Sequence, residues 1–253
     1  MRGDTGFPVR LRYTKRGKVR WISHRDVARA MERAFRITEL PLAFSEGFSP
    51  HPKVSFGLAL STGHESDAEY LDLEFVREVD LVELPAQLTA ALPEGMAVTG
   101  AERLVERAPA LQEVVTAVEW RIEVVHGDGS PVSAGVLRAR IEVALAAAEL
   151  PTERWRKGRQ VIEDVRPVIR HIDVAETERD TELITEVSME LSTQPRSAKP
   201  GEILAAIARV SGAPDDYVEA RTLRTHQWIE RDGTRWEPHD ADTRPRARVA
   251  HAS

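Results

Sequence analysis

Hydrophobic and polar residues alternate along the first third of the chain with two different periods. Residues 9–13 alternate apolar and basic side chains, as a half-buried strand does, and residues 69–75 alternate more strictly. Between these two strands, apolar residues repeat at the spacing of one helix face, beginning at a capping-box-like pair of Ser23 and Asp26. We therefore predict a helix from Ser23 to about Thr38. Its buried face consists of Val27, Ala30, Met31, Ala34 and Phe35.

Weaker patterns add three more elements to this part of the chain. Residues 54–60 have the pattern of a strand, residues 85–92 that of a short helix, and residues 97–104 that of a last strand. The order over residues 8–105 is then βαββαβ. This is the order of a ferredoxin-like domain, in which two helices cover one face of a four-stranded antiparallel sheet.

The second half of the chain repeats this order. Strand patterns occur at 118–125, 161–172, 181–191 and 217–228, and helix patterns occur at 133–148 and from Pro200 onward. The sequence therefore predicts an α+β fold of two tandem duplicated ferredoxin-like (βαββαβ) units with antiparallel sheets, at residues 8–107 and 117–229. A single mixed α+β domain is the alternative. Residues 230–253 lose all periodicity, which predicts a mobile tail in which Trp236 could still dock.

Charge is segregated along the chain in a way that the net charge of −6 hides. Residues 8–60 contain 11 basic and 4 acidic residues, whereas residues 61–150 contain 6 basic and 17 acidic residues. The basic segment favours contact with phosphates, while the acidic remainder opposes nonspecific binding to nucleic acid. Local neutralisation of the basic segment by the acidic one is the alternative interpretation.

Absent residue types and motifs exclude several classes of protein. The 253 residues include no cysteine, which excludes disulfides, thiolate zinc sites, cysteine nucleophiles and Cys-ligated iron–sulfur clusters. Walker A, G-x-G-x-x-G, H-E-x-x-H and G-x-S-x-G sequences are absent, so nucleotide hydrolysis, dinucleotide chemistry, zinc proteolysis and serine hydrolysis lose support. No 18 consecutive residues are apolar, and the first residues lack the apolar core of a signal peptide. We therefore expect a cytoplasmic protein without membrane contact.

One loop has no periodicity and contains two prolines. Residues 47–53 have the sequence Gly-Phe-Ser-Pro-His-Pro-Lys. Each proline favours an extended conformation for the residue before it, so Ser49 and His51 should be held extended. The loop then presents His51 and Lys53 rigidly and at a small entropic cost.

Basic and aromatic residues are interleaved around this loop. Basic groups that bind phosphates, together with aromatic faces that stack on bases, are typical of single-stranded RNA binding. The basic residues are Arg10, Arg12, Arg20, His24, Arg25, Arg29, His51 and Lys53, and the aromatic residues are Trp21, Phe44 and Phe48. Burial of the three aromatic side chains in the core is the alternative.

We predict one functional pocket in this region, in which Gly47 is needed for a positive φ or for close backbone approach. Its lining residues are Arg12, His24, Arg25, Ser45, Gly47, Phe48, His51 and Lys53. The alternative is that the loop is a strut between the two domains, with its aromatic side chains buried.

Histidines and carboxylates allow two chemical alternatives. His24 and His51 could act as acid and base in RNA cleavage, provided that their imidazoles converge on one pocket. A metal site would combine His64 with the carboxylates of Glu65, Asp67 and Glu69. Neither set has a diagnostic spacing, so the catalytic residues stay unassigned, and we expect no metal and no cofactor.

Several short segments are similar to one known family. They are residues 9–15, 21–26, 32–34, 40–56, 58–60, 63–66 and 69–72, with weaker similarity at 169–172, 199–204 and 221–225. Through these segments the chain resembles the bacterial radical-SAM-linked (radical-SAM-associated) protein family, a domain of unknown function. In that family the domain occurs alone or attached to a radical SAM enzyme with a cobalamin-binding part. Its members are often encoded beside a ribonuclease of the E/G type and ribosomal proteins.

The resemblance implies partners in RNA modification or RNA metabolism, namely tRNA or rRNA and a radical SAM/cobalamin enzyme. Because the chain has no cysteine and no D-x-H-x-x-G sequence, it cannot hold the iron–sulfur cluster or the cobalamin itself. We therefore expect an accessory RNA-associated protein with no catalysis of its own and no DNA specificity. The alternatives are a metal-free RNA-processing enzyme that uses His24 and His51, and a protein–protein adaptor that binds through the acidic segment 61–150.

Overall fold

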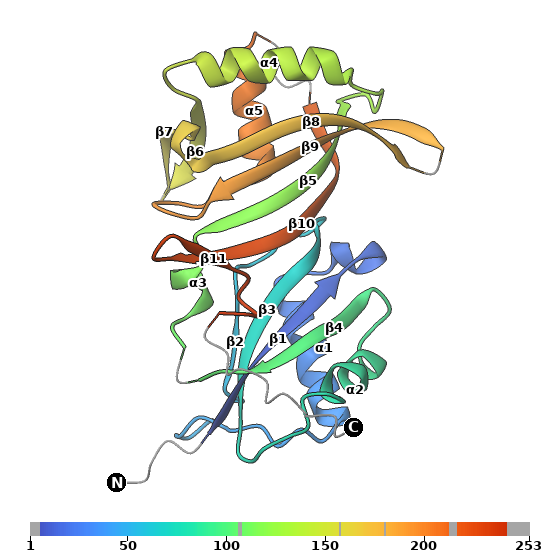
Figure 1. The fold of residues 1–253 in the computed structure, drawn as a ribbon, viewed down its shortest axis with the longest axis vertical. Coiled ribbons are helices and arrows are strands. Elements are labelled where there is room, and N and C mark those ends of the chain that lie inside the picture. The colour runs from blue at the N-terminus through green and yellow to red at the C-terminus, as the bar shows by residue number, and fades with distance from the viewer. Residues whose placement is uncertain (1–5, 106–107, 157, 180, 213–216, 242–253) are drawn as a thin grey trace, which may run out of the picture. The chain divides into compact units, whose positions relative to one another are not determined.

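The computed structural model of the protein describes residues 6–105, 108–156, 158–179, 181–212 and 217–241. The chain divides into two compact units (Figure 1). Unit 1 comprises residues 1–62, 66–114 and 229–253, and unit 2 comprises residues 63–65 and 115–228. Each unit therefore contains a segment from the other half of the chain.

Unit 1 contains the βαββαβ order that the hydrophobic pattern predicts. Its strands are antiparallel and have the spatial order β4-β1-β3, with β2 paired to β3 on the far side. A 3-10 helix, η1 (Gly17–Trp21), connects β1 to α1. The other elements are β1 (Phe7–Lys15), α1 (His24–Ile37), β2 (Val54–Phe56), β3 (Glu65–Phe75), α2 (Leu84–Ala91), β4 (Met96–Arg103) and the short α3 (Leu111–Val114).

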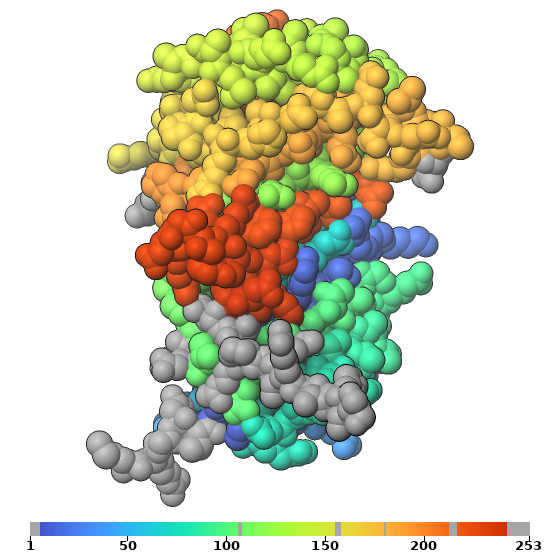
Figure 2. Space-filling model, in the orientation of Figure 1, coloured from blue at the N-terminus to red at the C-terminus, as the bar shows by residue number. Residues whose placement is uncertain are grey.

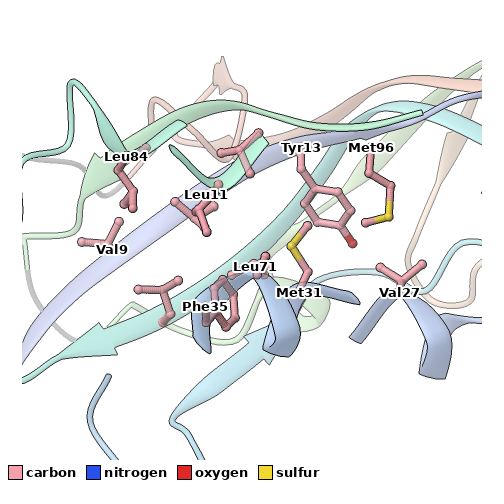
Figure 3. Close-up of a cluster of buried hydrophobic side chains, with 14 of the residues drawn as sticks. Val9, Leu11, Tyr13, Val27, Met31, Phe35, Leu71, Leu84 and Met96 are labelled. Atoms are coloured by element: carbon pink, nitrogen blue, oxygen red, sulfur yellow. The ribbon is translucent and has the colours of Figure 1, made fainter. Parts of the chain in front are cut away.

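The core of unit 1 lies between the sheet and its two long helices. Ser23 begins α1 with a capping box, because its hydroxyl accepts a hydrogen bond from the Asp26 amide while the Asp26 carboxylate accepts one from Ser23. This start directs Met31 and Phe35 toward Leu11 and Leu71 of the sheet (Figure 3). Residues of β1 alternate, so the side chains between the core positions face the other side of the sheet.

Unit 2 has the same element order and the corresponding antiparallel strand order, β10-β5-β9-β8. A separate two-stranded hairpin is inserted after its first helix. The single strand predicted over 161–172 is wrong, because a 3-10 turn at Pro167 separates two strands there. The elements are β5 (Ala117–His126), α4 (Ala134–Ala146), β6 (Pro151–Arg156), β7 (Arg159–Asp164), η2 (Arg166–Val168), β8 (Ile169–Arg179), β9 (Glu182–Ser192), α5 (Pro200–Val210) and β10 (Tyr217–Arg231).

The segment from residue 230 differs from the mobile tail that the sequence predicts. The end of β10 turns at Asp232 and Gly233, both at positive φ, and pairs with β11 (Thr234–Trp236). Residues 237–241, which we call the C-terminal strap, then pack on unit 1, where Pro238 and Ala241 are buried. Figure 2 shows red atoms of this segment on the near face, beside the blue of β1 and the green of β4. Residues 242–253 lie outside the described part.

The protein is therefore a mixed α+β protein with antiparallel sheets. None of the helices in the described ranges combines the length and the apolar character needed to cross a bilayer.

Candidate functional site

The loop that the sequence singles out is a narrow hairpin of residues 43–53, which we call the 43–53 hairpin. The Lys53 amide donates to the Ala43 carbonyl (2.8 Å), and the Ser45 amide donates to the His51 carbonyl (2.8 Å). The His51 amide in turn donates to Ser45 Oγ (3.0 Å). These bonds close the hairpin between Ser45 and His51, and the chain bends at residues 46–49, so Ser49 is not in the extended segment that the sequence predicts.

The tip of this hairpin exposes aromatic side chains. Gly47 has a φ of 126°, a conformation that favours glycine. Phe48 is 111% exposed and Phe44 is 54% exposed, and Trp21 in η1 is 63% exposed beneath the Arg20 guanidinium. The alternative that these three aromatic residues belong to the core is therefore wrong.

Four exposed arginines of α1 form a second feature, which we call the α1 arginine stripe. Arg25, Arg29, Arg33 and Arg36 fall within about 80° around the helix axis, opposite the buried face. Arg29 makes an exposed ion pair with Asp26 (3.2 Å). Within the described residues, the side chains of the other three make no hydrogen bond or ion pair. Their charge is available to a ligand.

The two histidines of the catalytic alternative lie on different elements of unit 1. His24, at the start of α1, packs edge-on against the ring of Phe56 with centroids 5.2 Å apart. His51 lies in the 43–53 hairpin, five residues before Phe56 in the chain. Their action as an acid–base pair stays a prediction.

Arg12 and Lys53 are engaged within the protein. Lys53, at the base of the hairpin, pairs with Glu74 (Nζ to Oε1, 3.0 Å). Arg12 lies on the sheet face opposite the helices, where its guanidinium contacts Glu237 (2.8 Å) and the Asp67 carbonyl (3.3 Å). The structure therefore distributes the predicted residues over three places. Ser45, Gly47, Phe48, His51 and Lys53 share the hairpin, His24 and Arg25 begin α1, and Arg12 lies on the opposite face.

A polar cluster in unit 2 was absent from the predicted site. His64 Nε2 lies 3.9 Å from Glu219 Oε1, which also accepts a hydrogen bond from Thr222 (2.9 Å). Burial raises the pKa of Glu219, while the Thr222 hydrogen bond and Lys199 oppose this rise. His64, Lys199 and Thr222 of this cluster belong to the 63–66, 199–204 and 221–225 segments that resemble the family. The resemblance of all three segments was the signal that could have identified the cluster.

The metal alternative does not assemble in the structure. The Glu65 carboxylate is bonded to Arg221 Nε (2.5 Å), and the Asp67 carboxylate is paired with Arg16. Across the part of the chain that the structure describes, no three His, Asp or Glu side chains are grouped to hold a metal ion.

A groove between α1 and α2 adjoins the arginine stripe. It has a volume of about 460 Å³ and is lined by Arg29, Arg33, Ala30, Leu92 and Pro93, with Ala91. A larger hollow of about 800 Å³ lies near the base of the hairpin, where Lys53 and Arg103 are already in ion pairs. Both cations that line the larger hollow are therefore paired, whereas Arg33 beside the smaller groove has no ion pair among the described residues.

Residues 9–200, more than half of the chain, match the model of a family described as an uncharacterized protein conserved in bacteria, DUF2344. No curated protein matches the sequence.

Solved structures show only distant likeness. A Cbf5-Nop10-Gar1 complex matches with a TM-score of 0.48 and 12% identity, over 90% of this chain and 54% of that chain. An H/ACA RNP bound to a substrate RNA containing 2′-deoxyuridine matches with a TM-score of 0.43 and 12% identity, over 90% and 48%. A putative dyp-type peroxidase from Shewanella oneidensis matches with a TM-score of 0.22 and 8% identity, over 86% and 91%. The chain spans about half the length of the first two, and at these scores none supports an inference about function.

Proposed function

The chain belongs to the bacterial protein family DUF2344, and we propose that it is an accessory protein that binds single-stranded RNA through the 43–53 hairpin and the α1 arginine stripe. The observation that carries this proposal is the full exposure of Phe48 at the tip of a hairpin held by cross-strand hydrogen bonds. An apolar ring in that position stabilises no core, so its contribution must come from a ligand.

The aromatic residues supply the stacking part of the interface. Phe44, Phe48 and Trp21 are exposed to solvent, with the Arg20 guanidinium over the Trp21 ring, and each base of a single strand has a face that can stack on an exposed ring. Such stacking tolerates any sequence and requires unpaired bases. The proposal therefore specifies single-stranded regions of RNA and gives no role to a DNA sequence.

The arginines supply the phosphate part. The stripe runs from Arg25 to Arg36 and so extends over about 17 Å along α1, with Trp21 just before the helix and the hairpin just after it in the chain. A guanidinium without a carboxylate partner binds phosphate oxygens in a bidentate manner at little cost. Arg25, Arg33 and Arg36 meet this condition.

A more specific part of the proposal concerns the partner protein and the cellular compartment. We propose that the protein acts in the cytoplasm and recruits RNA, either tRNA or rRNA, for a separate radical SAM/cobalamin enzyme. This part rests on the family resemblance and on the absence of cysteine from the chain, which leaves radical chemistry to another polypeptide.

We also propose that the two units arose by duplication of one ferredoxin-like unit, with domains near 8–107 and 117–229. What supports this is the shared order, β4-β1-β3-β2 in unit 1 and β10-β5-β9-β8 in unit 2. Among the described residues, the α1 arginine stripe and the 43–53 hairpin both belong to unit 1, so the proposed binding function is assigned to that copy.

Phe48→Ala tests the proposed function most simply. We expect single-stranded RNA to bind about tenfold more weakly, because one base loses its stacking partner, with the melting temperature unchanged. Val82→Ala, which shortens another exposed apolar side chain of unit 1, is the matched control. Fluorescence anisotropy with a labelled oligonucleotide measures both variants.

Equal RNA affinity for Phe48→Ala and wild type would refute the stacking role. If wild type binds no RNA at low salt but retains a protein partner on copurification from its host, and Phe48→Ala loses that partner, the hairpin belongs to an adaptor. Mass spectrometry of the copurified proteins tests the radical SAM partner separately.

A further inference from the structure

The face of the unit 1 sheet opposite α1 and α2 has a regular grid of side chains from β1, β3 and β4. The C-terminal strap lies over this grid. On one row, Arg12 of β1 lies between Tyr70 of β3 and Gly100 of β4. On the next row, Arg10 lies between Asp72 and Glu102. These positions alternate with the core residues of the same strands, so they face away from α1 and α2.

The strap contacts this grid through three consecutive residues. Glu237 Oε2 lies 2.8 Å from the Arg12 guanidinium and accepts a hydrogen bond from the Tyr70 hydroxyl (3.2 Å). The Pro238 carbonyl accepts one from Arg10 (2.9 Å). His239 lies on Gly100, where a Cβ atom would come within 2.5 Å of the imidazole. A glycine in β4 therefore makes room for the strap.

We propose that Arg12 and Tyr70 form an anion site for a backbone phosphate of RNA, and that the Glu237 carboxylate occupies this site as an internal competitor. The inference deepens the proposed function and rests on it for the identity of the ligand. A carboxylate and a phosphate accept hydrogen bonds from the same arginine and hydroxyl donors, so one can replace the other without rearrangement of the sheet.

Arg10 and Arg12 differ in how their charges are balanced, and only Arg12 is suited to bind an anion. Arg10 is fully buried and neutralised by two hydrogen bonds to Asp72, so it is a structural residue. Arg12 is bonded to no carboxylate other than Glu237 among the described residues. Removal of Glu237 therefore leaves Arg12, on β1, without a bonded carboxylate among the described residues, while burial and then the Asp240 carboxylate of the strap still contribute to raising the pKa of the adjacent Tyr70. This face of four-stranded antiparallel sheets is one on which single-stranded RNA binds in other proteins.

The test uses the full-length chain with Glu237→Ala, and with Glu237→Gln in case the first variant folds poorly. Glu142→Ala, which removes an exposed carboxylate of α4 in unit 2, gives the same change in net charge. Glu237→Ala combined with Arg12→Ala removes the site as well as its competitor. The probes are a single-stranded oligoribonucleotide and inorganic phosphate alone.

We expect Glu237→Ala to bind the oligoribonucleotide about two- to fivefold more tightly than wild type, as expected for loss of one partly exposed ion pair. Its plot of log affinity against log salt should be steeper by about 0.7, the contribution of one phosphate contact to a single strand. Inorganic phosphate should raise the melting temperature of Glu237→Ala but not that of the double variant. Glu142→Ala should match wild type in all three measurements.

A gain in phosphate binding without a gain in RNA binding would overturn the assignment to RNA and leave a site for free phosphate. No gain with either probe would overturn the site and show that the strap is only structural. If wild type binds no RNA through the hairpin and the stripe, the proposed function fails, and the phosphate measurement still decides whether Arg12 and Tyr70 bind an anion.

Discussion

Arg10 and Lys53 carry the same charge in unit 1, yet their ion pairs should contribute differently to stability. Arg10 is fully buried and donates hydrogen bonds to Asp72 and to the Pro238 carbonyl. Lys53 and Glu74 have side chains that are 40% and 26% exposed. Loss of one partner from a buried pair leaves an uncompensated charge, whereas solvent screens an exposed pair.

Arg10→Ala should therefore lower the free energy of unfolding by about 3 kcal/mol or more. Lys53→Ala should lower it by less than about 1 kcal/mol. Urea denaturation measures both losses on the same scale. Similar small losses for the two variants would show that the strap does not bury Arg10 in solution.

Some features of single residues could be predicted from the sequence and others could not. The positive φ expected at Gly47 is present, because glycine adopts this conformation without steric cost. The sequence left the exposure of Phe48 open between a stacking role and burial in the core, because most phenylalanines are buried and only the hairpin pairing places this one at a tip. Glu219 was missed because two of its neighbours, His64 and Lys199, come from distant segments of the chain.

At the scale of elements, hydrophobic periodicity predicts the helices and strands that bury one face of their own. It does not predict segments whose structure depends on contacts with residues far away in the chain. The α1 helix and β3 follow from their own patterns, because each buries one face. The strap has no pattern, and its structure depends on Arg10 and Arg12, more than 220 residues earlier in the chain. The predicted mobile tail was wrong over residues 230–241 for this reason.

The hairpin offers a test of its own at this scale. Gly47→Ala places a side chain at a φ of 126° with no atom within 4 Å, so only backbone strain results. We expect faster hydrogen exchange at the Ser45 and His51 amides and weaker RNA binding, although Phe48 is unchanged. Gly127→Ala is the control, since that glycine has open space and no positive φ. Unchanged exchange would mean that the hairpin does not depend on this conformation.

At the scale of the whole molecule, the basic residues of segment 8–60 that the structure describes include two groups, one paired with carboxylates and one exposed without such partners. Part of the basic segment 8–60 is neutralised by carboxylates from later in the chain, as with Arg10, Arg16 and Lys53. The α1 arginine stripe is not, because it lies on the solvent side of the helix. Counting charges along the chain predicts the excess but not its location, since pairing across strands determines which arginines stay available.

The salt dependence of RNA binding tests the central claim most directly. Arg25, Arg33 and Arg36 are changed together to alanine and compared with a control triple of exposed arginines elsewhere, Arg77, Arg159 and Arg209. Affinity for a single-stranded oligoribonucleotide is measured from low to physiological salt. If the stripe binds three phosphates, its loss should make the slope of log affinity against log salt shallower by about 2, while the control triple keeps the slope of wild type. Equal slopes for the two triples would contradict an RNA interface on α1.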